Sequence, residues 1–392
     1  MSEYAGHMSA RGKDTWRLSI EMGLSPEGHR LRRTSTFRGS KKAASAELTK
    51  RIHELNTGTS ATSGKMRLGE YLNRWLADYA KVKVAPKTYE VYADIVQNHL
   101  IPGLGHVPLA RLTPLHVEAY YREALESGRK NGCGGLSPRS VLHHHRVLKG
   151  AMGRAVKWQL IVRNPLDAVD PPRVTPHEVS TLDEDECVRL LQTSVGTELY
   201  LPILLAITTG MRRGEILALS WADVDLEDAS LVVRRSLEQT KEGVAFKAPK
   251  TNKSRRIVLP EFAVKRLRSH KAAQAATKLQ IGQGYNIDNL VVCNAEGLRW
   301  KPNSFSSSFH AFAKAKACSV TFHGLRHSHA SQLLKEGASV KVVSDRLGHS
   351  SAVVTMTTYA HTLRGMQEAA TEKFDGVLSA AFDNMDKAVS EG

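Results

Sequence analysis

Three short strings follow one another between residues 323 and 361: His323-Gly-Leu-Arg-His327, Leu347-Gly-His-Ser-Ser351 and Thr355-Met-Thr-Thr-Tyr-Ala-His361. A fourth, Thr209-Gly-Met-Arg-Arg-Gly-Glu215, stands far upstream. A tyrosine hydroxyl is a weak nucleophile near neutral pH unless its neighbours stabilise the charge that it develops. Tyr359, together with the arginines and histidines of the other strings, therefore indicates attack on an anionic centre, and the obvious one is a phosphodiester.

The composition of the chain agrees with an anionic partner. Its 55 Lys and Arg residues outnumber 39 Asp and Glu residues, which gives a formal net charge of +16. Such a charge favours binding to a polyanion and makes that binding sensitive to salt. Charge alone does not identify the polyanion, because ribosomal, membrane-surface and nucleic-acid-binding proteins share this property.

Length and hydropathy bound the architecture. A chain of 392 residues with 41% hydrophobic residues is too long for one core, so we expect two or three domains. We find no apolar run of about 18 residues and no amino-terminal signal segment, so we expect a soluble, cytoplasmic protein. The four cysteines are scattered without a C-x-x-C pair, so we interpret them as structural; they are Cys133, Cys187, Cys293 and Cys318.

Residues 1–64 carry the pattern of a small basic domain and its tether. Apolar and polar residues alternate over Thr15–Met22, which predicts a strand, and Ser25-Pro-Glu-Gly28 predicts a turn into a basic strand at His29–Phe37. Ser40 is placed to cap an amphipathic helix. Asn56–Gly64 has the composition of a flexible linker.

Residues 65–172 predict a compact bundle of about four helices. Apolar residues recur at helical spacing from Leu68 to Tyr79, and amphipathic runs follow at Lys87–His99, Thr113–Ser127 and Pro138–Lys157. A semi-rigid linker is expected around three prolines, Pro171, Pro172 and Pro176.

Residues 173–392 predict a mixed unit. Thr181 with Glu184 reads as a capping box at its first helix. Strands are expected at Ser230–Ser236 and Arg255–Leu259, with a turn at Ala248–Ser254 between the arms of a hairpin, and a last helix at Ala369–Val389. The expected fold class is a multidomain chain, mainly α with small β elements.

The four strings resemble the motifs of tyrosine recombinases of the phage integrase family. The family's T-G-x-R-x-x-E string is found at Thr209–Glu215, its H-x-L-R box at His323–Arg326, its L-G-H box at Leu347–His349 and its nucleophile at Tyr359. The resemblance covers the whole third unit and, more loosely, the three-part layout of the chain. It implies a site-specific DNA recombinase that forms a 3′-phosphotyrosine intermediate and integrates or excises a phage or other mobile element.

The resemblance also implies a task for each site residue. Arg212 and Arg326 would clamp the phosphate oxygens, which a planar guanidinium does better than an ammonium group. His323 and His349 would position or deprotonate the Tyr359 phenol and donate to phosphate oxygens. No metal or other cofactor is implied, because the arginines supply the positive charge.

The remaining assignments concern a lysine, a second arginine and a glutamate. The catalytic lysine of the family lies in the hairpin turn, where Lys250 fits best and Lys253 is the alternative; it would protonate the leaving 5′ oxygen. Arg213 stands beside Arg212, and only the family register selects Arg212. Glu215 would hold Arg212 in place through a buried ion pair.

Each of these residues also has a simpler interpretation. An arginine after a helix is usually a solvated charge, and a tyrosine near a helix is usually half-buried core. His323 and His327 are four residues apart, but no acidic third ligand follows at the spacing of a zinc site. The order and spacing of the strings together favour the catalytic interpretation.

The family further implies partners. Residues 65–172 and the third unit would clamp double-stranded core-site DNA, and residues 1–64 would bind arm sites. A homotetramer on DNA, an excision factor and a host DNA-bending protein are also expected, and no membrane. The side chains expected to face phosphates in the helical unit are Lys81, Lys83, Lys87, Arg139, His143, His144, His145, Arg146 and Lys149.

Two other functions fit parts of this pattern. A type IB topoisomerase would use the same residue types to nick and reseal one duplex, but the basic first unit and the H-x-L-R and L-G-H boxes favour a recombinase. A non-catalytic DNA-binding regulator would not depend on Tyr359 for its activity.

Overall fold

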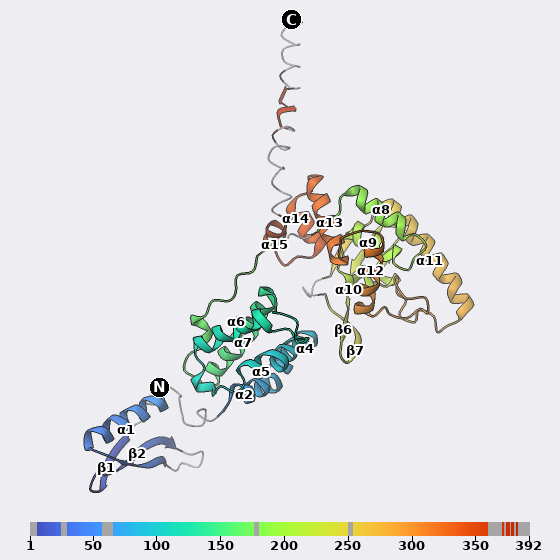
Figure 1. Cartoon of the computed structure of the whole chain (residues 1–392). Helices are drawn as coiled ribbons and strands as arrows, with labels where there is room; N and C mark the ends of the chain where they lie inside the picture. The colour runs from blue at the N-terminus through green and yellow to red at the C-terminus, as the bar shows by residue number, and fades with distance from the viewer. Residues whose placement is uncertain are drawn as a thin grey trace. The chain divides into compact units, whose positions relative to one another are not determined.

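The structure is a computed structural model of the chain. It describes residues 6–24, 30–56, 66–175, 180–249 and 254–359, together with residues 371, 374–376, 378–379 and 382. The chain forms two compact units, Met1–Pro176 and His177–Gly392; Figure 1 shows the chain with most of its helices labelled. None of the described helices is long and apolar enough to cross a membrane.

The first unit begins with an antiparallel sheet of three strands in the order β1-β2-β3. Its elements are β1 (Gly6–Gly12), β2 (Thr15–Leu24), β3 (Arg30–Arg38) and the helix α1 (Lys41–Asn56). Leu18 and Ile20 of β2 are buried with Ala44 and Leu48 of α1, because the alternation along β2 presents one apolar face to the helix. The Ser40 hydroxyl caps α1 by accepting the Ala43 N–H, as predicted.

Strand β1 was not predicted from the sequence. Its residues, Gly6-His-Met-Ser-Ala-Arg-Gly12, have no alternation of apolar and polar side chains, since most of them are exposed at the edge of the sheet. The strand depends instead on its antiparallel pairing with β2. The predicted turn at Ser25–Gly28 and residues 57–64 of the predicted linker lie outside the described residues.

The four predicted helical runs of the first unit are confirmed. Leu68–Lys83 is one continuous run through a π-helical turn, and Pro86–Leu104 is another. The elements are α2 (Leu68–Trp75), η1 (Leu76–Ala80), α3 (Lys81–Lys83), α4 (Pro86–Ile95), η2 (Val96–Leu100), α5 (Ile101–Leu104), η3 (Leu109–Arg111), α6 (Pro114–Ser127), α7 (Pro138–Lys157) and η4 (Pro165–Ala168).

Two of these helices, α6 and α7, begin where the sequence supplies a capping side chain. The side chains of Thr113 and Ser137 accept the N–H groups of His116 and Ser140, and a proline follows each cap at the first helical position. The helices enclose a core that is separate from that of the sheet. The division of this unit into an arm-binding and a core-binding domain stays a prediction.

The second unit is built around α9, an almost wholly apolar helix. Its helices are α8 (Glu184–Ser194), α9 (Tyr200–Thr209), α10 (Arg213–Leu217), η5 (Trp221–Asp223), α11 (Glu261–Ile281), α12 (Pro302–Ala315), α13 (Phe322–Lys335), α14 (Val340–Leu347) and α15 (Ala352–Thr358). A helix that is apolar on all sides must be surrounded, and α9 packs against α8, α10, α11 and α13. The first turns of α13 thereby lie against the carboxy-terminal ends of α9 and α14.

The strands of the second unit differ from the expected single hairpin. They are β4 (Val224–Asp225), β5 (Ser230–Val233), β6 (Ser236–Thr240), β7 (Gly243–Lys247) and β8 (Arg255–Val258). The predicted strands do pair, as β5 with β8, but a second hairpin of β6 and β7 stands between them in the chain. Ser236 therefore belongs to β6, and the predicted turn joins two different sheets.

Two further predictions about this unit have a definite outcome. The capping box at the first helix is formed by Asp183 and Glu186 rather than by Thr181 and Glu184, because α8 begins two residues later than predicted. Most of the predicted last helix, Ala369–Val389, lies outside the described residues. The expected fold class, mainly α with small β elements, is confirmed.

Candidate active site

The end of α9 provides the first acceptor of the site. Gly210 follows the helix with a φ of 65°, in the left-handed region that favours glycine. A Cβ atom at this position would also lie 2.6 Å from Cδ2 of His329. Both the backbone conformation and the lack of space therefore disfavour a side chain here. The Gly210 carbonyl accepts a hydrogen bond of 2.7 Å from Nη1 of Arg326.

The end of α14 provides two more acceptors in the same way. Gly348 ends this helix with a φ of 68°. The Leu347 carbonyl accepts a hydrogen bond of 2.8 Å from Nη2 of Arg326, and the Gly348 carbonyl accepts one of 3.1 Å from Nη2 of Arg212. Carbonyl groups at helix carboxy-termini carry partial negative charge, so two helix ends together stabilise two guanidinium groups.

Arg326 remains a cation although it is only 2% exposed. Burial, followed by the charge of Arg212, lowers its pKa to about 9. That value is still above neutral pH, so the guanidinium is protonated. Two of the five N–H groups of this guanidinium thus have an acceptor among the described residues: one on Nη1 donates to Gly210 and one on Nη2 to Leu347.

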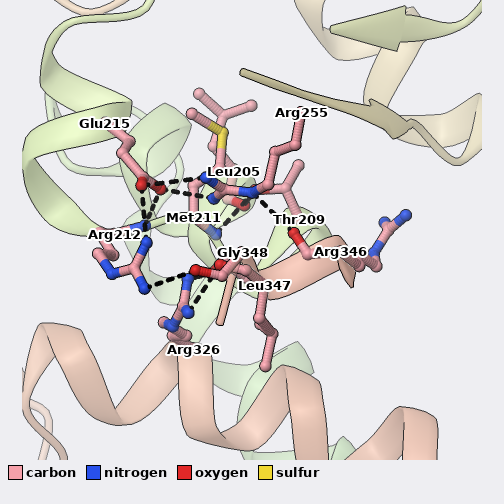
Figure 2. A network of polar contacts seen from close by, with 11 residues as sticks. Leu205, Thr209, Met211, Arg212, Glu215, Arg255, Arg326, Arg346, Leu347 and Gly348 are labelled. Atoms are coloured by element: carbon pink, nitrogen blue, oxygen red, sulfur yellow. Dashed lines mark hydrogen bonds and ion pairs between the residues drawn. The ribbon is translucent and has the colours of Figure 1, made fainter. Parts of the chain in front are cut away.

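Glu215 joins Arg212 to a second arginine, Arg255 of β8 (Figure 2). Nη1 of Arg212 lies 2.9 Å from Oε1 of Glu215, whose side chain is 1% exposed. The predicted ion pair is therefore present and buried. Burial would raise the pKa of the Glu215 carboxyl, but hydrogen bonds and charge from Arg255 and then Arg212 outweigh it and lower the pKa below its ordinary value.

Arg213 is separated from this cluster. Its Nη1 donates to the hydroxyl of Ser306 on α12. Arg212 precedes the first residue of α10 and Arg213 is that residue, so their side chains leave the backbone in different directions. The geometry thus distinguishes the two neighbouring arginines, as the family register did.

Tyr359 follows α15 and is almost completely buried, with 1% exposure. It packs in a small apolar cluster with Ala330, Leu334, Val343 and Leu347. Burial raises the pKa of its phenol to about 12, although the nearby charge of Arg326 acts in the opposite direction. The phenol is therefore neutral in this arrangement and needs a proton acceptor before it can attack.

His327 lies next to the Tyr359 hydroxyl, and no catalytic role was predicted for it from the sequence. Its Nδ1 lies 2.9 Å from the Tyr359 hydroxyl. From the sequence, His327 was weighed only as a possible zinc ligand together with His323. The spacing in the sequence could have indicated His327, because it follows Arg326 directly and stands one helical turn after His323. In the structure the rings of His323 and His327 are 4.9 Å apart.

The two histidines assigned from the sequence have other contacts. Nδ1 of His349 is hydrogen-bonded to Oγ1 of Thr355 at 2.8 Å, and burial followed by the charges of Arg326 and Arg212 lowers its pKa to about 4. His323 has an exposed surface, but partial loss of water around its ring, followed by the charges of Arg326 and Arg212, lowers its pKa. Both rings are neutral near pH 7.

Lys250 and Lys253 lie outside the described residues, so the choice between them stays a prediction. Strands β7 and β8 flank this turn. Among the residues that the structure describes, no group of three or more His, Cys, Asp or Glu could hold a metal ion.

Comparison with known proteins identifies this arrangement. The model of the Phage integrase family matches residues 180–365, and that of the Phage integrase N-terminal SAM-like domain matches residues 67–125. The chain belongs to the phage integrase family. This chain is therefore a tyrosine recombinase, an enzyme that cleaves and rejoins DNA.

Relatives and solved structures extend the likeness to most of the chain. A tyrosine recombinase XerC-like protein of Caldanaerobacter subterraneus is 24% identical over 94% of this chain and 97% of its own length. The Tn1549 transposon integrase, solved with circular-intermediate DNA, covers 78% of this chain and 100% of its own at 20% identity and a TM-score of 0.65. A lambda integrase tetramer bound to a Holliday junction covers 88% and 96%, at 21% identity and a TM-score of 0.54. These solved structures show that the fold is shared.

One prediction about the integrase surface is wrong. His144 and His145 were expected to face phosphates, but both are buried in the helical unit. Nδ1 of His144 is 2.8 Å from the hydroxyl of Tyr120, and Nδ1 of His145 is 2.7 Å from that of Tyr121. Burial lowers the pKa of His144 to about 4 and lowers that of His145, so neither ring carries the charge that a phosphate contact needs.

The other side chains in that prediction are on the surface. His143, Arg146 and Lys149 are exposed on α7, and Arg146 and Lys149 line a shallow pocket to which the buried His145 ring also contributes. The side chains of Lys81, Lys83, Lys87 and Arg139 are exposed as well. Their contact with DNA stays a prediction.

Proposed function

We propose that Tyr359 attacks a DNA phosphate whose non-bridging oxygens are held by Arg212 and Arg326. The observation that carries this proposal is the convergence of three groups on one helix end. Arg326 and Arg212 donate to the adjacent carbonyls of Leu347 and Gly348, and Tyr359 packs against Leu347. Two cations and a tyrosine from separate parts of the chain thus meet around the end of α14.

The chemistry follows from this grouping. Attack by the phenolate oxygen forms a bond to phosphorus, and negative charge builds on the non-bridging oxygens in the transition state. The bond to the 5′ oxygen breaks, and that oxygen takes a proton from Lys250 or Lys253. The product is a 3′-phosphotyrosine, which conserves the energy of the phosphodiester. A free 5′-hydroxyl can therefore reverse the step without ATP.

His327 is the proposed acceptor of the phenolic proton. A buried phenol with a pKa raised to about 12 does not ionise unaided near neutral pH. Nδ1 of His327 already lies at hydrogen-bond distance from the phenol, whereas Nδ1 of His349 is hydrogen-bonded to Thr355. His323 and His349 keep the proposed role of donating to phosphate oxygens.

The proposal extends to partners by likeness. Integrases of a transposon and of phage lambda share the fold, and the latter forms a tetramer on a Holliday junction. We propose that this recombinase also acts as a tetramer on double-stranded DNA, binding core sites with residues 65–172 and the second unit. An excision factor and a host DNA-bending protein would assist in moving the mobile element.

A suicide substrate that traps the covalent intermediate tests the central step. Wild-type protein should form a denaturation-resistant adduct with the fragment whose new 3′ end carries the scissile phosphate. Tyr359→Phe should bind the same duplex in a gel-shift assay and form no adduct. An adduct that survives this change would rule out Tyr359 as the nucleophile.

A substrate with sulfur at the 5′ bridging position tests the lysine. Because a thiolate leaves without protonation, loss of the general acid should be rescued by this substrate. We expect rescue of Lys250→Ala and no rescue of Lys253→Ala. The reverse pattern would transfer the role to Lys253.

Deletion of residues 1–64 tests whether this segment binds arm sites while the rest of the chain cleaves the core site. The truncated chain should lose binding to distal arm sites and keep cleavage at the core site. Equal loss of both would contradict the separate arm-binding role.

A further inference from the structure

Arg255, the first residue of β8, touches both of the groups that hold Arg212. Its guanidinium donates to both oxygens of Glu215, from Nη1 to Oε1 at 3.1 Å and from Nη2 to Oε2 at 2.6 Å. Its Nε donates to the carbonyl of Arg346 at 2.9 Å, and its side chain is only 10% exposed. Arg255 therefore bonds to Glu215 on one side and to the end of α14 on the other.

This contact favours the ionised form of Glu215. The carboxylate lies where burial opposes charge, and Arg255 is the largest of the influences that offset burial. An ionised carboxylate accepts the Arg212 guanidinium and the Arg212 backbone N–H at 2.9 Å each. Loss of the Arg255 fork would thus weaken the group that fixes both the side chain and the backbone of Arg212.

Gly348, the second acceptor of Arg212, also lies against Arg255. A Cβ atom on Gly348 would approach Nη1 of Arg255 to 3.0 Å, so the guanidinium packs directly on this glycine. The Gly348 carbonyl then points to Nη2 of Arg212 (Figure 2). Both partners of the Arg212 guanidinium, a carboxylate and a carbonyl, are held by Arg255.

We propose that Arg255 is a positioning residue that sets the Arg212 guanidinium at the phosphate. This inference rests on the proposed role of Arg212. Arg255 acts through Arg212 and needs no contact with DNA. A lysine at this position would keep the charge, but an ammonium group cannot donate to two carboxylate oxygens and a carbonyl in one plane.

Arg256 supplies a matched control on the same strand. Successive strand residues point to opposite faces, and the Arg256 side chain leaves the site for the surface, where it pairs with Asp228. It is 54% exposed. Replacement of Arg256 by lysine makes the same chemical change one residue away from the network.

The experiment compares two substrates in single-turnover cleavage by the full chain. One has the normal scissile phosphodiester, and the other has a methylphosphonate there. The methyl group replaces one charged oxygen, so the transition state carries less negative charge and depends less on Arg212. A variant that acts through Arg212 must therefore lose less activity on the methylphosphonate, whereas a variant that merely weakens the fold must lose the same factor on both.

For Arg255→Lys we expect a loss of about 10- to 100-fold on the phosphodiester and of less than about threefold on the methylphosphonate, since small misplacements of a positioning group have effects of this size. Arg256→Lys should match wild type on both substrates. Equal losses on the two substrates, or no loss on the phosphodiester, would overturn the inference. Arg255→Gln serves as a second variant, and if neither variant folds, Arg255 is a core-stabilising residue and the inference is wrong.

Arg212→Lys separates this inference from the proposal beneath it. It should show the same dependence on the substrate as Arg255→Lys, with a larger loss. If Arg212→Lys shows no such dependence, the proposed role of Arg212 fails. If the loss depends on the substrate for Arg212→Lys but not for Arg255→Lys, only the positioning role of Arg255 fails.

Discussion

Arg326 in the second unit and His144 in the first are almost equally buried, at 2% and 4% exposure. Arg326 donates to two carbonyl groups at helix ends and stays protonated near neutral pH, although its pKa is lowered to about 9. His144 is hydrogen-bonded to the hydroxyl of Tyr120, and its pKa is lowered to about 4, so it is neutral. Two similarly buried groups thus differ in charge: Arg326 is a cation and His144 is neutral.

The partners and the intrinsic basicity of each group explain the difference. A guanidinium is intrinsically basic enough to stay charged when carbonyls and a carboxylate surround it, whereas an imidazole beside a neutral hydroxyl loses its proton when water is removed. The difference teaches that a basic string in the sequence predicts a cationic surface only where the side chains reach solvent. A cation inside the protein needs acceptors that the fold must supply.

Replacement of the Arg326 guanidinium in the second unit should have the largest effect on the cleavage rate. Arg326→Lys keeps a charge but cannot donate to two carbonyls and to phosphate oxygens together, so we expect cleavage to slow by about 10³-fold. Arg213→Lys, the control outside the cluster, should lose less than about threefold. Single-turnover cleavage rates measure both, and equal effects of the two changes would contradict the special position of Arg326.

Loss of the titrating group in the first unit should change how stability depends on pH. The pKa of His144 is about 4 in the folded chain and about 6.5 when unfolded, so the unfolded chain binds more protons between these values. Its contribution is fully present above pH 6.5 and is lost as the pH falls toward 4, by up to about 3 kcal/mol. His144→Gln, which can keep the bond to Tyr120, should remove this part of the dependence.

Urea unfolding at pH 7 and pH 5 measures the effect of His144→Gln, with His143→Gln as the exposed control. The control should show the pH dependence of wild type. A wild-type dependence that His144→Gln leaves unchanged would show that the His144 ring is not the group that titrates.

His327 contrasts with His144, because both contact a tyrosine hydroxyl but only His327 is proposed to take its proton. His327→Ala should slow cleavage by about 10²-fold, which is the lower range for loss of a general base. His310→Ala, at an exposed histidine of α12, should have no effect on the cleavage rate. Faster cleavage by His327→Ala would mean that this histidine restrains Tyr359 instead of activating it.

Charge at the surface of α7 should give the smallest effect. Arg146→Ala should weaken DNA binding severalfold and lower the slope of log K against log salt by about 0.9, if it contacts one phosphate. His145→Gln should leave the slope unchanged, because the buried ring carries no charge to contribute. Gel-shift titrations at three salt concentrations measure both slopes, and a change with His145→Gln would restore the expectation that this histidine faces DNA.

The sequence by itself determined the residue types of the site and most of the helices. Attack on a phosphate requires a nucleophile and cations in reach, so Tyr359, Arg212 and Arg326 could be found from the order of their strings. The helical runs of the first unit were found because burial of one face imposes a period on the side chains. Glu215, in the same string as Arg212, could be assigned to it as the partner in a buried ion pair.

Only the tertiary structure decided which residues from distant segments meet. Arg255 reaches Glu215 across 40 positions of sequence, and no local pattern marks it. His144 and His145 are adjacent on α7, yet both are buried because Tyr120 and Tyr121 of α6 face them in the same order. Periodicity along one chain reports which face of an element is apolar, whereas burial and charge depend on what packs against that face.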